Sequence, residues 1–532
     1  MKKNEIYIIE IEDIGNDGEG IGHVVGSGED ADMDNGSAQS ISDDSERQEN
    51  RGIAVFVKDT VVGDVVRIRI VKVKKHYAYG RLEEILVPSP YRVDARCEKA
   101  RSCGGCTLMH MSYEKQLDYK WNKVRNCLER IGGVEHVADL MEPICGMEEP
   151  YHYRNKMQFP VGLDKEGRVQ IGFYAGRTHS IIDLEQCEIG HPVNDYILKE
   201  LRPWLQNWQD KTGNFIYDEE QHKGLVRHIL TRVGFATGEL MVCLVINGDF
   251  LPTYEQKSEK EQKASGQVYS GAELIESLFR ALEAYNQMQE NSACVRDGND
   301  DRQEGKMCRI PTLTSLSINI NKEKTNRILG DTCKTLWGNP YITDSIGDIQ
   351  FRISPMSFYQ VNPVQTKILY DKAVEFAGLT GEEVVWDMYC GIGTISLCLA
   401  QKAKKVYGVE IIPQAVEDAK KNAERNGLTN TEFFCGKAEE VVPEFYRTGD
   451  NPGQHPDVVV VDPPRKGCEE VLLDTIVAMA PKRLVYVSCD PATLARDVKI
   501  LGEKGFRLEK VGVIDQFGHS VHVESVVLMT QK

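Results

Sequence analysis

The sequence has no apolar run approaching the roughly 20 residues that a membrane-spanning helix needs. We also expect no signal peptide, because Met1-Lys2-Lys3-Asn4-Glu5 leads straight into a strand-like segment. Its 15 cysteines are an odd number without a secretory signal, which argues against a disulfide framework and favours metal or thiol chemistry. We therefore expect a soluble, monomeric, cytoplasmic protein without a membrane partner.

An overall positive charge is also missing, since the 532 residues carry a net charge of −17. Residues 26–51 contribute −6 (eight acids, two bases) and residues 250–308 contribute −4 (11 acids, seven bases), which leaves −7 for the rest. Both segments are rich in small and polar residues, and we interpret them as peripheral, solvated insertions with little core of their own. Local basic patches are then a better guide to a polyanionic partner than net charge. The length allows about three domains.

The N-terminal part is predicted to form a small β-barrel of the OB type. Residues 4–25 and 52–86 contain several short strands with glycine-rich turns. Residues 65–81 hold two tyrosines, Tyr77 and Tyr79, no acid and six basic residues: Arg67, Arg69, Lys72, Lys74, Lys75 and Arg81. Such a patch suits RNA backbone contact and base stacking, although an ordinary solvated strand face has the same pattern.

Three cysteines follow within ten residues, at Cys97, Cys103 and Cys106, with Gly104 and Gly105 between the last two. Soft ligands at this spacing in a cytosolic chain predict a metal site, and Cys187 is the candidate for the fourth thiolate. Zinc and an iron–sulfur cluster both fit four sulfurs, and the spacing leaves both open.

A predicted central region contains a helix at about 112–132 and strands between residues 151 and 246. Its basic residues predict a polyanion groove or, alternatively, a solvated sheet face. They are Arg154, Lys156, Arg177, Arg227 and Arg232.

The last third alternates strand and helix, which predicts a doubly wound parallel sheet. A glycine loop at 391–393 follows a strand that ends at Asp387, and Glu410 ends the next strand 23 residues later. This pattern indicates an adenosine site whose ribose is held by Glu410. The loop lacks the third glycine of the dinucleotide fingerprint, so S-adenosylmethionine fits better than a nicotinamide or flavin. Asp462 follows a third strand over the same crevice.

Cys489 is the candidate nucleophile. It follows the apolar run 484–488 and precedes Pro491, where a helix is expected to begin. A thiol at the carboxyl end of a strand and near a helix N-terminus lies where open sheets bind ligands and where the helix dipole favours a thiolate. The alternative is a small buried hydrophobe.

Together these motifs resemble the RNA uracil-5-methyltransferase family, in its iron–sulfur branch that acts on 23S ribosomal RNA. The resemblance rests on the cysteine set and on five further motifs, in order: Ser357-Phe358-Tyr359-Gln360-Val361-Asn362, Asp387-Met388-Tyr389-Cys390-Gly391, Asp462-Pro463-Pro464-Arg465, Ser488-Cys489-Asp490-Pro491 and His522-Val523-Glu524. It implies a TRAM barrel at 1–87, a central α+β domain with a [4Fe–4S] cluster at 88–354, and a Rossmann-like class I methyltransferase domain at 355–532. It thereby selects the cluster over zinc, with Cys97, Cys103, Cys106 and Cys187 as ligands.

The resemblance also implies roles for individual residues. Gln360, Tyr389, Glu410 and Asp462 would hold S-adenosylmethionine, Cys489 would attack carbon 6 of a uridine in 23S ribosomal RNA, and Glu524 would act as the base. Alternation along 519–524 is expected to place His522 and Glu524 on one strand face. The alternative is a Glu524 paired with Arg496 or Arg465.

One position departs from the family, which usually has asparagine where Asp490 stands. An extra carboxylate beside a thiol raises the pKa of the thiol unless it is hydrogen-bonded elsewhere. Two other functions remain open: methylation of transfer RNA, and a non-catalytic RNA-binding module with a vestigial donor site.

Overall fold

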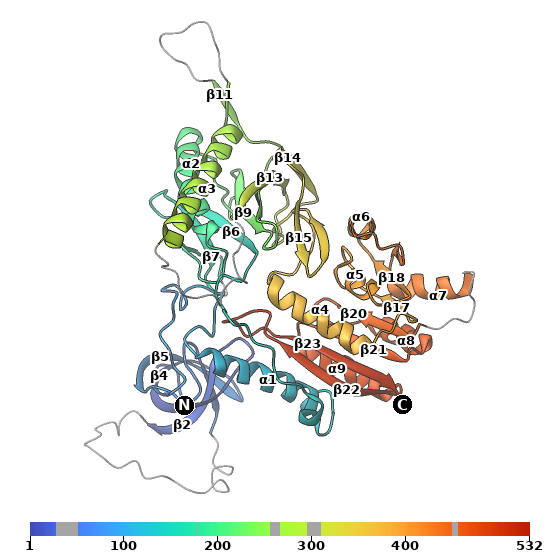
Figure 1. Ribbon diagram of the computed structural model, residues 1–532. Coiled ribbons are helices and arrows are strands. Elements are labelled where there is room, and N and C mark those ends of the chain that lie inside the picture. The colour runs from blue at the N-terminus through green and yellow to red at the C-terminus, as the bar shows by residue number, and fades with distance from the viewer. Residues whose placement is uncertain (28–51, 177, 256–266, 295–309, 449–455) are drawn as a thin grey trace, which may run out of the picture. The chain divides into compact units, whose positions relative to one another are not determined.

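The computed structural model describes residues 1–27, 52–176, 178–255, 267–294, 310–448 and 456–532 (Figure 1). The predicted insertion at 26–51 therefore lies almost wholly outside the described residues. The chain forms two compact units: unit 1 comprises residues 1–122 and 517–522, and unit 2 comprises residues 123–516 and 523–532. The expected central domain, 88–354, is divided, because its residues 88–122 belong to unit 1 and the rest belongs to unit 2. The expected last domain, 355–532, falls in unit 2 except for residues 517–522. Among the helices of the described parts, none is long and apolar enough to cross a membrane.

Unit 1 contains a closed five-stranded barrel, which confirms the predicted N-terminal fold. The strand order is β1-β2-β3-β5-β4, with β1 (Ile6–Ile14), β2 (Gly20–Ser27), β3 (Ala54–Val57), β4 (Val65–Val73) and β5 (Tyr77–Val87). Alternation in β4 buries Val66, Ile68 and Ile70 in the barrel core. The arginines between them point outward, as a half-buried strand requires.

The basic strand pair of the barrel is partly neutralised. Arg67 forms an ion pair with Glu84, and both Arg69 and Arg81 form ion pairs with Glu83. Lys72, Lys74 and Lys75 are exposed near the β4–β5 turn. The rings of Tyr77 and Tyr79 lie 5.6 and 5.8 Å from that of Phe56. The part of this surface that is open to a polyanion is therefore the turn rather than the whole strand pair. Helix α1 (Tyr113–Arg130) follows.

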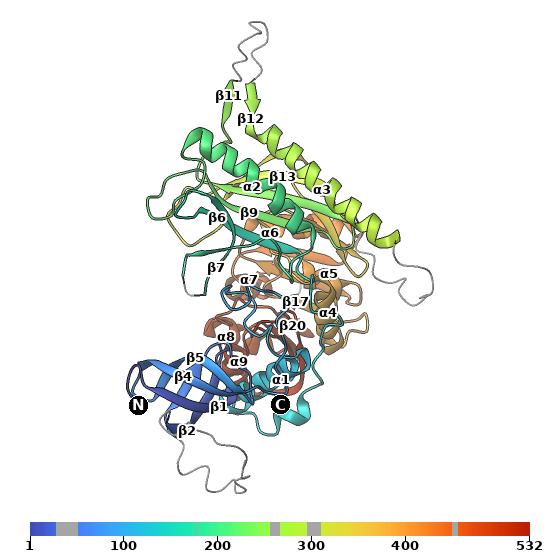
Figure 2. The ribbon, with the colours of Figure 1, turned by 90° about the vertical axis from the view of Figure 1, so that its left-hand side faces the viewer.

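The first large sheet of unit 2 has seven strands in the order β14-β13-β10-β9-β6-β7-β8. The strands are β6 (Lys156–Leu163), β7 (Val169–Tyr174), β8 (Ile181–Asp183), β9 (Val226–Val233), β10 (Glu239–Ile246), β13 (Thr312–Ile320) and β14 (Thr332–Gly338). All neighbours are antiparallel except β10 and β13. Helices α2 (Val193–Thr212) and α3 (Ser270–Cys294) lie side by side over one face (Figure 2). Shorter elements are η1 (Val137–Leu140), the β11 (Thr253–Glu255) and β12 (Gln267–Tyr269) hairpin, and the β15 (Ile342–Ile346) and β16 (Ile349–Ile353) hairpin.

Helix α3 corrects the interpretation of residues 250–308 as a solvated insertion. Leu274, Leu278 and Ala281 of this helix are fully buried in the core that α2 shares with the sheet. The acids are spaced so that an apolar stripe remains, and this stripe is what a surface helix buries. The prediction is therefore wrong for α3, while residues 256–266 and 295–309 lie outside the described part.

The second large sheet has the order β19-β18-β17-β20-β21-β23-β22. Its strands are β17 (Val384–Asp387), β18 (Lys405–Glu410), β19 (Thr431–Cys435), β20 (Val458–Val461), β21 (Arg483–Ser488), β22 (Phe506–Ile514) and β23 (Glu524–Gln531). Helix α4 (Pro363–Ala377) precedes the sheet in the chain. The helices between its strands are α5 (Thr394–Ala400), α6 (Pro413–Arg425), α7 (Ala438–Thr448), α8 (Glu470–Met479) and α9 (Pro491–Glu503). Five strands are parallel, as the alternation predicts, and β23 is antiparallel to both β21 and β22. The four valines of β20 are all buried, as expected of a strand covered on both faces.

Candidate active site

Three of the predicted site residues, Glu410, Asp462 and Cys489, lie with Asp387 at one edge of the second sheet. Asp387 and Glu410 are the last residues of β17 and β18, and Asp462 and Cys489 directly follow β20 and β21. These four strands are parallel neighbours in the order β18-β17-β20-β21. The carboxyl edge of such a sheet is where open α/β folds bind their ligands. The strand alternation is thus sufficient to gather these side chains.

The glycine loop and Glu410 form a cradle at this edge. The amide groups of Gly391 and Ile412 donate hydrogen bonds of 3.1 and 2.9 Å to the Glu410 carboxylate. Gly391 has a φ of 53°, and a Cβ there would meet no atom within 4 Å, so the space above the loop is open. Ile411 and Ile412 are 59% and 56% exposed beside it. A carboxylate accepts more than two hydrogen bonds, so this arrangement fits an adenosine with its ribose hydroxyls on Glu410.

Asp387 stabilises the start of the glycine loop. Ser396 donates a hydrogen bond of 2.5 Å to the buried Asp387 carboxyl, and burial raises the pKa of Asp387 to about 6. Tyr389 is half-buried in the same loop, and burial together with the neighbouring Cys468 raises its pKa. Asp387 therefore fixes the turn that carries the open glycine loop and Tyr389.

Gln360 lies in the loop before α4 and is 7% exposed. Asn155, which directly precedes β6, donates a hydrogen bond of 3.0 Å to the Gln360 carbonyl, and Arg232 of β9 donates one of 3.0 Å to the Ser357 carbonyl. Within the described residues, no hydrogen bond joins Gln360 to the four residues at the strand edge. The loop is therefore positioned by the first sheet, and the proximity of Gln360 to the donor site stays a prediction.

Cys489 and Glu524 lie at opposing positions of two paired strands. Ser488 of β21 is paired with Ser525 of β23, so Cys489 follows one partner and Glu524 precedes the other. Glu524 is 3% exposed, and its burial, followed by the charge of Asp462, raises its pKa well above the usual range. Burial, Glu524 and Asp462 together raise the pKa of Cys489 to about 11, and the Arg465 guanidinium partly opposes both shifts. Burial likewise raises the pKa of Asp462 to about 7.

The expectation that helix α9 favours a Cys489 thiolate is therefore wrong. Asp490 is the N-cap of α9, and its carboxylate accepts hydrogen bonds of 2.9 and 3.1 Å from the amides of Ala492 and Thr493. These are the groups through which a helix N-terminus would stabilise a thiolate, and Asp490 already occupies them. Asparagine caps a helix equally well, so the departure at Asp490 preserves the local structure.

The alternation predicted for residues 519–524 is also wrong. β23 begins at Glu524, residues 517–522 form a bend that belongs to unit 1, and His522 is exposed. His519 in this bend has a positive φ of 63°, and its amide donates a 3.0 Å hydrogen bond to Gln116. Glu524 is thus buried because it begins a core strand, and the suggested pairing with Arg496 does not occur, since Arg496 forms an ion pair with Asp497.

Asp497 of α9 organises the loop after Asp462, which the sequence interpretation missed. This fully buried carboxylate accepts hydrogen bonds of 2.9 Å from the Cys468 amide and 2.7 Å from the Tyr486 hydroxyl. Arg496 forms an ion pair with it at 2.6 Å and donates to the Lys466 and Cys468 carbonyls. The sequence signal is an Arg-Asp pair nearly two turns into the helix, whose Asp lies seven residues after the N-cap. Helix α9 therefore holds the loop that carries Asp462 and Arg465.

We expect Asp497→Asn to lower the free energy of unfolding by about 2–4 kcal/mol, because it leaves buried donors without their charged acceptor. Denaturant titration measures this change. Asp474→Asn is the matched control: Asp474 forms an exposed ion pair with Lys504, and such pairs contribute about 1 kcal/mol or less. Equal effects of the two substitutions would show that Asp497 does not organise the loop.

The predicted metal ligands fall in both units, with Cys97, Cys103 and Cys106 in unit 1 and Cys187 in unit 2. All four side chains are half-buried. In the part of the chain that the structure describes, no group of three or more His, Cys, Asp or Glu side chains is arranged to hold a metal ion. The structure therefore gives no support to the predicted cluster, and nothing in the site above depends on it.

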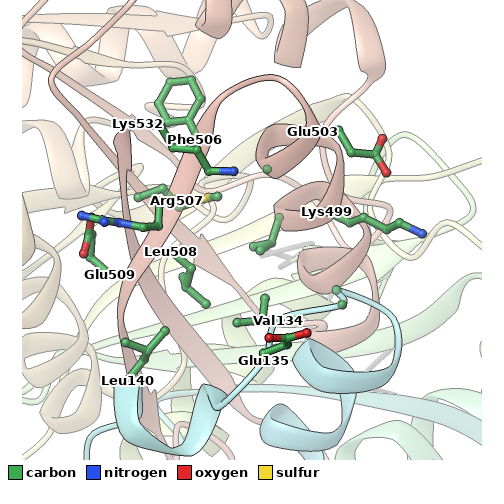
Figure 3. Close-up of a pocket in the computed structure, with 15 residues that line it drawn as sticks. Val134, Glu135, Leu140, Lys499, Glu503, Phe506, Arg507, Leu508, Glu509 and Lys532 are labelled. Carbon is green, nitrogen blue, oxygen red and sulfur yellow. The ribbon is translucent and has the colours of Figure 1, made fainter.

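A hollow of about 760 Å³ lies at the opposite end of the second sheet (Figure 3). It is lined by the end of α9, the start of β22, the end of β23 and residues between 132 and 140. Lys499, Arg507 and Lys532 share it with an equal number of acids, among them Glu509, which pairs with Arg507 at 2.7 Å. None of the predicted site residues lines it, so it is not the donor site.

Sequence comparisons match this architecture. The model of the tRNA (uracil-5-)-methyltransferase family matches residues 339–532, and the TRAM domain model matches residues 2–82. Proteins named uncharacterized RNA methyltransferase from Clostridium tetani and Listeria innocua are each 42% identical over the whole chain, covering 97% and 99% of their own lengths. The chain belongs to the RNA uracil-5-methyltransferase family. The family resemblance of its motifs is thereby confirmed.

A solved structure supports the family's fold over the full length. The chain is similar to the Pyrococcus abyssi tRNA (uracil-54, C5)-methyltransferase in complex with S-adenosyl-L-homocysteine, with a TM-score of 0.65 and 23% identity. The match covers 98% of this chain and 99% of that chain. At this identity the likeness concerns the fold, which in this family joins a TRAM barrel to a methyltransferase domain.

Proposed function

We propose that this protein transfers a methyl group from S-adenosylmethionine to carbon 5 of a uridine in 23S ribosomal RNA. The observation that carries the proposal is the pairing of Ser488 with Ser525, which puts Cys489 opposite Glu524 at the same sheet edge as Glu410. The open glycine loop and the two-amide anchor of Glu410 fit the donor. Tyr389, Asp462 and Gln360 are proposed to complete the donor site.

The thiol is needed because carbon 5 of uracil is a weak nucleophile. Attack of the Cys489 thiolate on carbon 6 forms an S–C bond and moves the ring electrons toward oxygen 4. Carbon 5 of the adduct is then electron-rich and accepts the methyl group. When bound, S-adenosylmethionine supplies this group on an electrophilic sulfonium. The target base must leave any stack to reach a thiol at the sheet edge.

Glu524 completes the reaction by removing the proton from carbon 5. The C5–H electrons restore the double bond between carbons 5 and 6, and the S–C6 bond breaks to release the Cys489 thiolate. Both groups must be ionised for their tasks, whereas burial favours their neutral forms. The Arg465 guanidinium favours the ionised forms of both Cys489 and Glu524. We therefore assign to Arg465 the role of setting how much of each group is ionised.

Methylation of defined RNAs tests the proposal. Purified protein with labelled S-adenosylmethionine is expected to form 5-methyluridine in unmodified 23S ribosomal RNA transcripts, and sequencing of the product locates the base. Absence of 5-methyluridine from every RNA offered, together with no donor binding in calorimetry, would favour the non-catalytic RNA-binding module instead.

Transfer RNA is the second candidate substrate. It is favoured by the description of the matching family model and by the name of the similar Pyrococcus abyssi enzyme. A competition between 23S and transfer RNA transcripts at equal concentration separates the two. We expect ribosomal RNA to be preferred because the cysteine set resembles the ribosomal branch.

The [4Fe–4S] cluster on Cys97, Cys103, Cys106 and Cys187 stays a prediction of the sequence resemblance. Visible absorbance that bleaches on reduction, in protein purified without oxygen, distinguishes a cluster from zinc or from no metal.

A further inference from the structure

We propose that Lys156 and Arg232, with Arg154 beside them, form a binding site for one backbone phosphate of the RNA substrate. The inference rests on the proposed function, because it takes RNA to be the substrate. It adds a binding site whose residues are separate from the catalytic and donor-binding residues. It lies on the first sheet, on the face that carries the Ser357–Gln360 loop.

The sheet register brings the cations together. Lys156 of β6 is paired directly with Arg232 of β9 in an antiparallel ladder. Alternation along residues 154–158 puts Arg154, Lys156 and Gln158 on one partly exposed face, while Asn155 and Met157 are buried. Arg154 donates a 3.0 Å hydrogen bond to the Lys156 carbonyl, which keeps its guanidinium beside the pair. Of the five bases considered in the sequence, Arg227 instead bonds the Asn321 and Glu323 carbonyls, and Arg177 lies outside the described residues.

The Arg232 guanidinium has N–H groups that donate to no acceptor in the described residues. Its side chain is 1% exposed, and one nitrogen donates to the Ser357 carbonyl. Its Nε and Nη1 atoms are buried without a hydrogen-bond partner. A buried guanidinium with two unsatisfied N–H groups is costly, and such groups are commonly completed by an anion or by bound water. The forked donor geometry of arginine matches a phosphate.

The positive charge here is not balanced within unit 2. In the described part of the chain, neither Lys156 nor Arg232 forms an ion pair. The acid that interacts with Arg232 is Asp344, which already accepts hydrogen bonds from the Ala236 amide and the Tyr359 hydroxyl. Burial raises the pKa of Asp344 to about 6, and burial together with the two arginines lowers the pKa of Lys156 to about 7. The lowered pKa of Lys156 is that of a cation buried among like charges, and a bound anion would raise it again.

The position of the site favours an RNA phosphate. Arg232 and Asn155 hold the two ends of the segment between Ser357 and Gln360, so a ligand on Lys156 lies next to the loop that the proposed function assigns to the active site. Phe358 of this loop is 69% exposed, as an aromatic that meets a base would be. A single-stranded RNA that places a uridine at the sheet edge also brings its backbone phosphates close, and Lys156 is the half-buried cation that they would meet.

Equilibrium binding to an unmodified 23S ribosomal RNA transcript across a salt series tests the site. Loss of one phosphate contact lowers the slope of log K against log salt by about 1. We therefore expect Lys156→Gln to bind about 5- to 10-fold more weakly at 0.1 M salt, with that reduced slope. Lys156→Arg should retain wild-type affinity. Lys165→Gln, at an exposed lysine in the β6–β7 turn, is the matched control and should change nothing.

An unchanged salt slope in Lys156→Gln would overturn the site. An equal fall in affinity for S-adenosylmethionine, measured by calorimetry, would also overturn it, because the anion would then be the donor's carboxylate. Binding is measured without turnover. Wild-type protein that binds RNA with the expected salt dependence and forms no 5-methyluridine would therefore refute the proposed function and leave the phosphate site standing.

Discussion

Replacement of Cys489 by alanine is expected to abolish methyl transfer and to remove any covalent complex with RNA that contains 5-fluorouridine. The fluorine at carbon 5 cannot be taken away as a proton is, so an enzyme that adds a thiolate to carbon 6 is trapped on the RNA after one methylation. A denaturing gel reveals this adduct. No other group at the sheet edge forms a covalent bond in the proposed reaction, so we expect a loss of at least about 10⁴-fold, as for other covalent catalysts that lose their nucleophile.

Two measurements sharpen this prediction. Cys333→Ala removes a half-buried thiol of the first sheet and should leave the rate and the adduct unchanged. Because burial raises the pKa of Cys489 to about 11, kcat/KM of the wild-type enzyme should rise at least about tenfold per pH unit between pH 7 and 9. Residual adduct in Cys489→Ala would exclude Cys489 as the nucleophile, and a rate independent of pH in this range would contradict the raised pKa of its thiol.

The substitution Glu524→Gln is expected to stop the reaction after methyl transfer rather than before it. The amide has the shape of the carboxylate but cannot accept the carbon 5 proton, so the methylated base stays bonded to Cys489. We expect turnover to fall by about 10²- to 10⁴-fold. Ordinary RNA should then give a denaturation-resistant complex that contains one methyl group per enzyme.

Glu509→Gln on the neighbouring strand β22 is the matched control, because Glu509 pairs with Arg507 and takes no part in the site. It should turn over normally. Should Glu524→Gln fall in rate without accumulating the complex, Glu524 acts before methyl transfer and the base is another group.

Much of this site is predictable from sequence because it depends on strand ends. Asp387, Glu410, Asp462 and Cys489 each end an apolar run, and parallel strands bring such ends to one edge. The same reasoning fails for Glu524, where alternation was extended through residues 519–523. Residues 517–522 form a bend, and the strand begins only at Glu524, so none of residues 519–523 belongs to it.

The remaining features depend on long-range contacts that local pattern does not encode. The capping bonds of Asp490 and the loop contacts of Asp497 require the packed helix α9. The juxtaposition of Lys156 and Arg232 requires the register of β6 against β9, which lie 76 residues apart in the chain by this pair. The acidic composition of residues 250–308 favours a solvated segment over a core helix, although the leucines of helix α3 recur at helical spacing.

The burial of Cys489 beside Glu524 and Asp462 has a consequence for the survival of the enzyme in the cell. With its pKa at about 11, only about one Cys489 side chain in ten thousand is a thiolate at pH 7. Peroxides and electrophiles attack thiolates, so an enzyme waiting for RNA is protected from oxidative inactivation by the same carboxylates that slow its chemistry. Sensitivity to such reagents should accordingly appear only when a substrate, or a change at Asp462 or Glu524, releases the thiol from its acidic neighbours.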